Sequence, residues 1–426
     1  MKKLFLTTIL AISAFVLFAQ NLDKVKDLYK AKKLEEARTQ VDQFLAVEKN
    51  KKNSEAWYYK TKIYNDISFD EKLSASVPDA RKTAFESLKT YVSVDDKQLI
   101  NLQLDNYKPV TDMYQGYFKD GAAFYNKNDY KNAYPNFKNC LAVSDYMIEK
   151  KWSTQTFDTS VVLYTGVSAE KSDQRDEAAV YYGRLAEAKV TGEGMVEIYK
   201  WLVDYYNTKK DDVNTQKYLA LGKEVYPADA FWDSMELDRL REKGDKKALF
   251  AKYEEIIAKN PNSHVFRFNY AAELYQEGYS DPDVAKRPAN STELIAKSEE
   301  QLKKVVELKP DYTQAQIVLG QLYYNQAVDL NAQVKAIKPP AGGKLKPEEL
   351  KKKDELRTEM MKKFDQAVPH LEKIDAQLSP QGKLKMEDKK TLKDALDLLI
   401  TINDQKGNKE KVKVYEEKFN NVDKVH

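Results

Sequence analysis

Apolar residues recur along this chain of 426 residues with a period of about 34. Pro227 and Pro261 lie 34 residues apart, and each closes a pair of segments with helical apolar periodicity; Pro310 follows 49 residues later, which is the same period with an insertion. A repeat of this length predicts helical hairpins, each of which buries its apolar face against its neighbours. Such a solenoid builds binding surfaces far more often than active sites.

The clearest copy of the repeat begins near Tyr114. An aromatic, a small residue and a second aromatic on one helix are answered by a small, a large and a small residue on the next: Tyr117, Gly121 and Phe124, then Ala133, Phe137 and Cys140. At these offsets the chain resembles the tetratricopeptide repeat (TPR) family. The spacing has a physical reason, because small residues let two helices approach closely while the aromatics fill the groove beside them.

The same frame recurs through nearly all of the chain. The resemblance implies an all-α, right-handed superhelical solenoid of about eight or nine antiparallel helix pairs. We expect TPR-like hairpins over 20–112, central repeats over 113–229, repeats with an insertion over 230–310, a repeat with an extended hairpin over 311–380 and capping helices over 381–426. The motif is weakest around 230–260, which makes this segment a candidate joint.

Three copies carry insertions at the turn inside the hairpin, and the largest separates Tyr323 from Ala367 by 44 residues. It contains a Pro-Pro-Ala-Gly-Gly turn signal at 339–343, flanked by helix-favouring sequence. The pattern predicts two over-long helices, roughly 312–336 and 347–377, that form a projecting hairpin. Its extra length, 326–358, is either a surface elaboration or a docking element.

The first 19 residues read as a secretory signal peptide. Lys2 and Lys3 precede an apolar stretch from Leu4 to Phe18, and charged sequence begins after Ala19-Gln20. This pattern predicts export with cleavage after Ala19; the alternative, an uncleaved anchor, would need about 20 apolar residues. Cys140 is far from the cleavage site, so N-terminal lipidation is not expected, and no later stretch approaches membrane length.

Charge and cysteine content narrow the classes of partner. Net charge is +3, and about +1 once Lys2 and Lys3 are removed, which gives no electrostatic reason to expect nucleic acid. Cys140 is the only cysteine and cannot form an internal disulfide, so we expect it to be a small buried residue.

The sequence contains no motif that predicts catalysis. His264, His370 and His426 are too scattered to suggest a metal site, and Gly342-Gly343-Lys344 lacks the spacing of a phosphate-binding loop. A serine or cysteine nucleophile would need a histidine base, and no histidine stands at a spacing that would supply one. We therefore expect no cofactor, no metal and no enzymatic activity.

The resemblance to TPR proteins implies a concave groove lined by the first helix of each hairpin. Counting along the repeat frame gives these candidate partner-binding residues: Tyr58, Lys62, Asn65, Phe118, Tyr125, Lys200, Asp204, Asn207, Asn269, Glu273, Gln276, Gln321 and Tyr324. Amides, tyrosines and a few charges can hydrogen-bond a peptide backbone and offer flat apolar contacts.

Two functional hypotheses follow. The first is an exported, non-catalytic TPR scaffold that binds envelope proteins or peptide segments in the periplasm or at the outer membrane of a Gram-negative type of cell, or outside the cell. The second is a glycan-binding TPR solenoid of the outer envelope, because tyrosine and tryptophan rings can stack on sugars. Glycan-binding proteins built on TPR helices are longer and loop-rich and carry a lipidated cysteine. This chain has neither feature.

Overall fold

The fold is all-α, as the sequence predicts. The computed structural model is 78% helical, and the residues that it describes, 21–340 and 343–426, contain no strand. The predicted signal peptide, 1–19, lies outside these residues. No helix among the described residues is long and apolar enough to cross a membrane.

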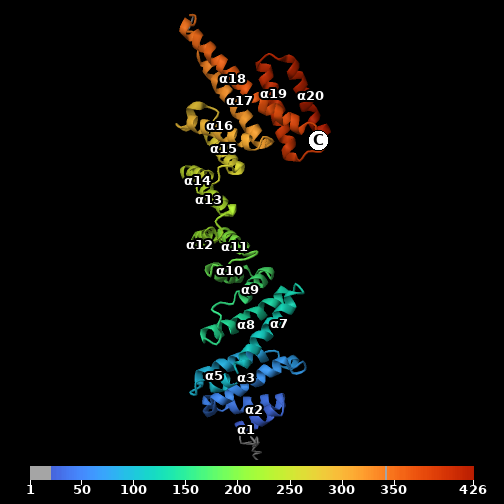
Figure 1. Cartoon of the computed structure of the whole chain (residues 1–426). Coiled ribbons are helices and arrows are strands. Elements are labelled where there is room, and N and C mark those ends of the chain that lie inside the picture. The colour runs from blue at the N-terminus through green and yellow to red at the C-terminus, as the bar shows by residue number, and fades with distance from the viewer. Residues whose placement is uncertain (1–20, 341–342) are drawn as a thin grey trace, which may run out of the picture. The chain divides into compact units, whose positions relative to one another are not determined.

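Consecutive helices form nine pairs within the described part of the chain, which agrees with the eight or nine predicted (Figure 1). The first five pairs are α1 (Leu22–Lys30) with α2 (Leu34–Ala46), α3 (Ser54–Phe69) with α5 (Ala80–Val94), α7 (Lys108–Tyr125) with α8 (Tyr130–Glu149), α9 (Thr159–Lys171) with α10 (Arg175–Glu187), and α11 (Met195–Thr208) with α12 (Asp212–Val225). The other four are α13 (Ala230–Glu242) with α14 (Lys246–Lys259), α15 (His264–Gly278) with α16 (Ser291–Leu308), α17 (Thr313–Ala336) with α18 (Pro347–Leu378), and α19 (Met386–Gln405) with α20 (Lys409–Val425).

Short helices occupy several of the connections. The predicted insertion between α3 and α5 contains α4 (Leu73–Ser76), and the one between α15 and α16 contains the 3₁₀ turn η2 (Val284–Lys286). A further 3₁₀ turn, η1 (Glu48–Lys52), precedes α3. Residues 95–107 depart from the repeat without any signal in the motif: they form α6 (Ile100–Leu104), which packs against α3 and buries Leu102 completely.

The chain divides into two compact units, one ending at Trp232 and the other beginning at Asp233. This boundary falls at the start of the segment in which the repeat motif is weakest, the predicted joint at 230–260. We refer to the two parts as unit 1 and unit 2.

Within the pairs, small residues sit where the motif requires them. A Cβ added to Gly121 of α7 would lie 2.9 Å from Cδ1 of Phe137 on α8, and one added to Gly166 of α9 would lie 2.8 Å from the ring of Tyr182 on α10. Real Cβ atoms do not approach so closely, so each large ring fills the space that the missing side chain leaves. The motif alanines of the second helices are completely buried: Ala84, Ala133, Ala178 and Ala367.

Aspartates begin several of the helices. Asp129, Asp158, Asp211 and Asp245 each accept a hydrogen bond from the backbone N–H three residues on, at the start of α8, α9, α12 and α14. This is the preferred N-cap arrangement, and it satisfies one of the N–H groups that the first turn leaves without a partner. These aspartates therefore stabilise the N-termini of the helices that they precede.

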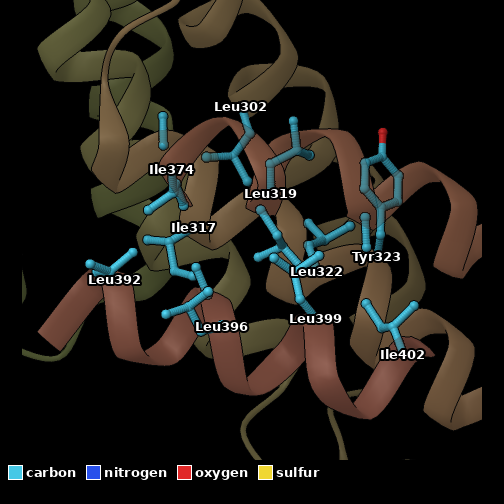
Figure 2. Close-up of a cluster of buried hydrophobic side chains, with 14 of the residues drawn as sticks. Leu302, Ile317, Leu319, Leu322, Tyr323, Ile374, Leu392, Leu396, Leu399 and Ile402 are labelled. Atoms are coloured by element: carbon cyan, nitrogen blue, oxygen red, sulfur yellow. The ribbon is translucent and has the colours of Figure 1, made fainter. Parts of the chain in front are cut away.

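The extended hairpin of unit 2 has the predicted form. Helix α17 ends at Ala336 and helix α18 begins at Pro347, as the sequence predicts, and α18 runs for 32 residues. Its base lies in the largest apolar cluster of unit 2, to which α16, α17, α18 and α19 contribute (Figure 2). Residues 348–359 are largely exposed, so only the base of the hairpin is held by the core.

Gly121→Leu should destabilise unit 1, because the new side chain would have to displace the ring of Phe137. We expect a loss of roughly 3 kcal/mol in the free energy of unfolding, the upper range for overpacking a well-packed core. Chemical denaturation followed by circular dichroism measures it. Gly382→Leu is the control, since no atom lies within 4 Å of a Cβ added there; equal stability of the two variants would contradict the packing described for Gly121.

Candidate functional site

The candidate binding residues all lie on first helices of pairs, as the repeat frame predicts. Tyr58, Lys62 and Asn65 lie on α3, Phe118 and Tyr125 on α7, Lys200, Asp204 and Asn207 on α11, Asn269, Glu273 and Gln276 on α15, and Gln321 and Tyr324 on α17. They are divided between unit 1 and unit 2. Their environments differ sharply, so they do not form one uniform set.

Tyr58 and Asn65 are more buried than the repeat frame predicts for positions in an open groove. Their side chains are only 4% and 2% exposed. For Tyr58 the physical reason is the unpredicted segment 95–107, in which α6 packs against α3 and Asp105 lies beside the tyrosine hydroxyl. Asn65 instead contacts Asp112 of α7. The hydroxyl of Tyr58 donates to Asp105 instead of facing a partner.

Lys62 and Asn65 nevertheless line the wall of a pocket of about 640 Å³ in unit 1, which we call the N-terminal pocket. Its lining comes from α1, the first residue of α2, α3, α7 and the connecting segments. The residues of the N-terminal pocket are Tyr29, Lys32, Leu34, Lys62, Asn65, Asp66, Phe69, Asp70, Asp105, Lys108, Pro109, Asp112 and Gln115. Seven of these thirteen side chains carry a charge, and the site is therefore strongly polar.

Each lysine of the N-terminal pocket pairs with an aspartate. The Nζ–Oδ2 distances are 2.7 Å for Lys62 with Asp105 and 2.5 Å for Lys108 with Asp112, and Lys32 lies 3.5 Å from Asp66. Such pairs exposed to solvent contribute little to stability. Their consequence is electrostatic, since no ammonium group of the pocket is left without a carboxylate.

Two tyrosine hydroxyls complete the polar network of the pocket. Tyr29 donates to Oδ2 of Asp66 at 2.9 Å, and Tyr58 donates to Oδ2 of Asp105. Burial alone would raise the pKa of Asp105, but hydrogen bonds from Lys62 and Tyr58 outweigh it and hold that pKa below its ordinary value. Asp105 therefore remains ionised at neutral pH and keeps its charge in the pocket.

The amide of Asn65 is incompletely satisfied. Its Nδ2 donates to Oδ2 of Asp112 at 3.3 Å, which fixes the orientation of the amide, because the reverse orientation would set two oxygens against each other. Its Oδ1 is buried and has no hydrogen-bond partner in the described part of the chain. A buried acceptor without a donor is costly, so Asn65 is an unusual residue in a wall of otherwise paired groups.

Phe118 and Tyr125 belong to an aromatic cluster of the central repeats. Both pack edge-on against Phe137 and Tyr164, with ring centroids 5.3–6.2 Å apart, and Phe137 stacks on Tyr164. The rings of Phe118, Tyr125 and Tyr164 are half-buried, and that of Phe137 is almost completely buried. Their main role is to join α7, α8 and α9, and only their outer edges face solvent.

The predicted residues of α11 and α15 fall into paired and exposed groups. Lys200 lies 2.8 Å from Asp229 and 3.1 Å from Glu197, whereas Asp204 is exposed. In unit 2, the mostly buried Glu273 binds Arg241 at 2.7 Å and Lys246 at 3.0 Å, and so holds α13 and α14 against α15. Asn207 is half-buried.

The remaining predicted residues lie in unit 2. Asn269 and Gln276 are exposed on α15, one turn either side of Glu273. On α17, Gln321 is half-buried, and Tyr324 packs against Phe364 of the extended hairpin with ring centroids 6.0 Å apart. Asn269 and Gln276 are therefore the residues of this group with the most surface to offer a partner.

The tyrosines are predominantly structural. All 28 lie among the described residues, and each is buried or half-buried. In many of them the ring packs in a hairpin while the hydroxyl donates to a carboxylate of a neighbouring helix, as in Tyr114 with Asp158 at 3.0 Å and Tyr134 with Glu177 at 2.8 Å. A buried phenol needs such a partner.

Several residues of the N-terminal pocket were missed in the sequence. Tyr29 lies in the poorest copy of the repeat, Asp105 in the segment that has no place in the motif, and Asp112 on the first turns of α7 ahead of the motif residues. Asp66 directly follows Asn65, and its place next to a predicted residue is the one signal in the sequence that could have identified it. No spacing rule connects the others, because the fold brings them together from four separate segments.

Cys140 behaves as predicted. It is completely buried in α8, and its Sγ donates weakly to the carbonyl of Tyr114 at 3.4 Å. Burial raises the pKa of its thiol, which keeps the group protonated and unreactive. Among the described residues, no group of three or more His, Cys, Asp or Glu side chains is arranged to hold a metal ion.

The likeness of this chain to known proteins is confined to solved structures. No model of a known protein family matches the chain, and no curated protein sequence matches it. Among solved structures, the chain is similar to a TPR repeats protein from Bacteroides fragilis, with 16% identity over 66% of this chain and 97% of that one and a TM-score of 0.28. It is also similar to yeast Tom70, with 11% identity over 93% and 90% of the two chains and a TM-score of 0.29.

Both TM-scores are low, and these likenesses carry no argument by themselves. The class is defined by the helix pairs and by the small residues that pack against large ones at the motif positions. On that basis the protein is an all-helical, TPR-like repeat protein.

The buried tyrosines predict loss of stability at high pH. Burial raises the pKa of Tyr91, Tyr117 and Tyr199 to about 12. Because these values lie above the unfolded value of 10.0, the stabilisation is fully present below about pH 10 and is lost as the pH rises toward 12. We expect phenolate absorbance to rise together with loss of the helical circular dichroism signal. Complete ionisation of the tyrosines near pH 10 with helicity unchanged would contradict this prediction.

Proposed function

We propose that the protein is an exported, non-catalytic TPR-like scaffold that binds segments of other proteins in the cell envelope of a Gram-negative type of bacterium. The observation that carries the proposal is the N-terminal pocket, which lies on the first helices of unit 1, where the repeat frame expects a partner. The exposed polar residues Asp204, Asn269 and Gln276 lie on equivalent helices further along the chain. A repeat architecture throughout supports binding as the main activity.

Glycan binding remains the second candidate, with less support. Sugar recognition by stacking needs exposed aromatic faces. Among the described residues every tyrosine is at least half-buried, and Phe69 is the only aromatic among the large exposed apolar side chains. Retention of the protein by polysaccharide in affinity gels, without capture of any envelope protein, would reverse this ranking.

Export is testable at the N-terminus. The charged start, short apolar stretch and Ala19-Gln20 boundary support cleavage after Ala19. When the protein is expressed in a Gram-negative host, we expect mass spectrometry of the periplasmic or secreted material to show a chain that begins at Gln20. Recovery of the intact chain beginning at Met1 from the cytoplasm would contradict export.

Partner binding is testable by affinity capture from envelope extract. The parent is compared with a variant that carries Asp204→Ala, Asn269→Ala and Gln276→Ala, all on first helices. The matched control carries Gln216→Ala, Lys247→Ala and Glu300→Ala, which are exposed residues of the second helices α12, α14 and α16. These exposed substitutions should leave stability within about 0.5 kcal/mol of the parent.

We expect proteins retained by the parent and by the control to be lost, or reduced at least tenfold, with the first-helix variant. Circular dichroism and a melting curve confirm that each variant is folded. Equal retention by both variants would contradict binding through the first helices, and the extended hairpin would become the next surface to test.

A further inference from the structure

The N-terminal pocket has more hydrogen-bond acceptors than donors. Asp66, Asp105 and Asp112 each receive their hydrogen bonds and ion pairs from the described residues on Oδ2. Oδ1 of each carboxylate is thus left for water or a ligand. Asp70 similarly uses Oδ1 to accept from the backbone N–H groups of Lys72 and Leu73, which leaves its Oδ2.

The charges of the pocket also favour a ligand that donates hydrogen bonds. Four aspartates and three lysines line it, for a net charge of −1, and each ammonium group already lies beside a carboxylate. An anionic ligand would meet four carboxylates and would have to break an ion pair to gain a partner. A cation meets carboxylate oxygens that are free to accept, so the electrostatic complementarity is with a positive group.

Asn65 supplies the second, independent observation. It lines the pocket, is 98% buried, and its Oδ1 has no donor among the described residues, while its Nδ2 is held by Asp112. A buried acceptor of this kind needs an N–H or O–H group from elsewhere. A ligand with several donors would satisfy Asn65 and the neighbouring carboxylates together.

The aromatic wall also suits a cation. Nζ of Lys32 and Nζ of Lys62 each lie 5.4 Å from the ring centroid of Tyr29, so this ring already lies beside positive charge, which an aromatic face accommodates. Lys32 and Lys108 are mostly exposed and can swing aside at little cost, so that a ligand can replace them beside Asp66 and Asp112.

We propose that the N-terminal pocket receives the guanidinium group of an arginine in a segment of a partner protein. Guanidinium carries five N–H donors in a planar fork, is always charged and stacks on aromatic rings, whereas an ammonium offers three donors from one point. It therefore matches an array of carboxylate oxygens, one amide oxygen and a tyrosine ring. This inference rests on the proposed function, since it names the chemistry by which the scaffold recognises a segment.

The test uses the complete chain and four blocked tripeptides, acetyl-Gly-X-Gly-amide, in which X is arginine, citrulline, lysine or glutamate. Isothermal titration calorimetry at low salt should give a Kd of about 1 mM for the arginine peptide, which is weaker than the best affinity that a ligand of roughly 20 heavy atoms can reach. Citrulline has almost the same shape without the charge, and should bind at least tenfold more weakly.

Two sets of variants locate the site. Asp66→Asn with Asp112→Asn should weaken binding of the arginine peptide at least tenfold. The control, Asp145→Asn, removes a carboxylate that pairs with Arg184 outside the pocket and should leave binding unchanged. Lys32→Ala with Lys108→Ala should tighten binding severalfold, because it removes the two exposed cations that compete for the same carboxylates.

The opposite effects of the two sets guard against loss of folding, since an unfolded variant would not bind more tightly. Any of four results would overturn the inference: no saturable binding of the arginine peptide up to about 10 mM, equal binding of citrulline, tighter binding of the glutamate peptide, or no response to either set of variants. If capture of envelope proteins is still lost with the first-helix variant in that case, the scaffold function stands and only the arginine pocket is rejected.

Discussion

The fold depends on the close approach of small residues to large ones inside the hairpins. Where Gly121 faces Phe137 and Gly166 faces Tyr182, the ring occupies the volume that a Cβ would need. The two helices can then lie near enough for the aromatic groups around them to exclude water, and burial of these rings is the main source of stability. The chain has only 14 glycines in 426 residues and no disulfide, so this packing must be repeated pair after pair. Each hairpin stabilises mainly its neighbours, and the division at Trp232 falls where the motif is weakest.

Tyrosine links this packing to the polar surface. Its ring fills the hairpin, and its hydroxyl reaches the edge of the helix, where a carboxylate from the adjoining helix accepts its hydrogen bond, as Tyr134 does with Glu177. The arrangement satisfies the one polar atom of an otherwise apolar side chain and also orders a surface carboxylate. This explains how a chain can contain 28 tyrosines without exposing any of them fully. It also explains why tyrosines at groove positions, such as Tyr58, are poor guides to partner contacts.

The sequence predicted the fold closely because many copies of the repeat carry the same signal, so a poor match in one copy has little effect on the prediction. The number of pairs, the helical class and the bounds of the extended hairpin follow from periodicity, which many residues report together. The site depends on few residues and benefits from no such repetition. Tyr58 and Asn65 were placed on the correct helix, yet both are buried, because Tyr58 binds Asp105 of the segment 95–107 and Asn65 binds Asp112 of α7. That segment has no counterpart in the repeat, and the fate of Asp105 depends on tertiary contacts with Lys62 and Tyr58, which are more than 40 residues away. Spacing along the chain contains no information about such a contact.

Specific recognition in a protein of this kind should arise where the repeat is broken. At regular positions, the aromatic and small residues are committed to packing and many of the carboxylates to tyrosines, so little hydrogen-bonding capacity is left for a ligand. The N-terminal pocket differs because Lys32 comes from a turn, Asp70 begins the insertion that follows α3, and Asp105 follows α6. These irregular segments bring more carboxylates than hydrogen-bond donors to the wall of α3, and Asn65 is left with an acceptor that no described residue satisfies. A buried amide oxygen without a donor costs stability. Its presence beside an excess of carboxylate oxygens is explained if a donor from another molecule completes the pocket.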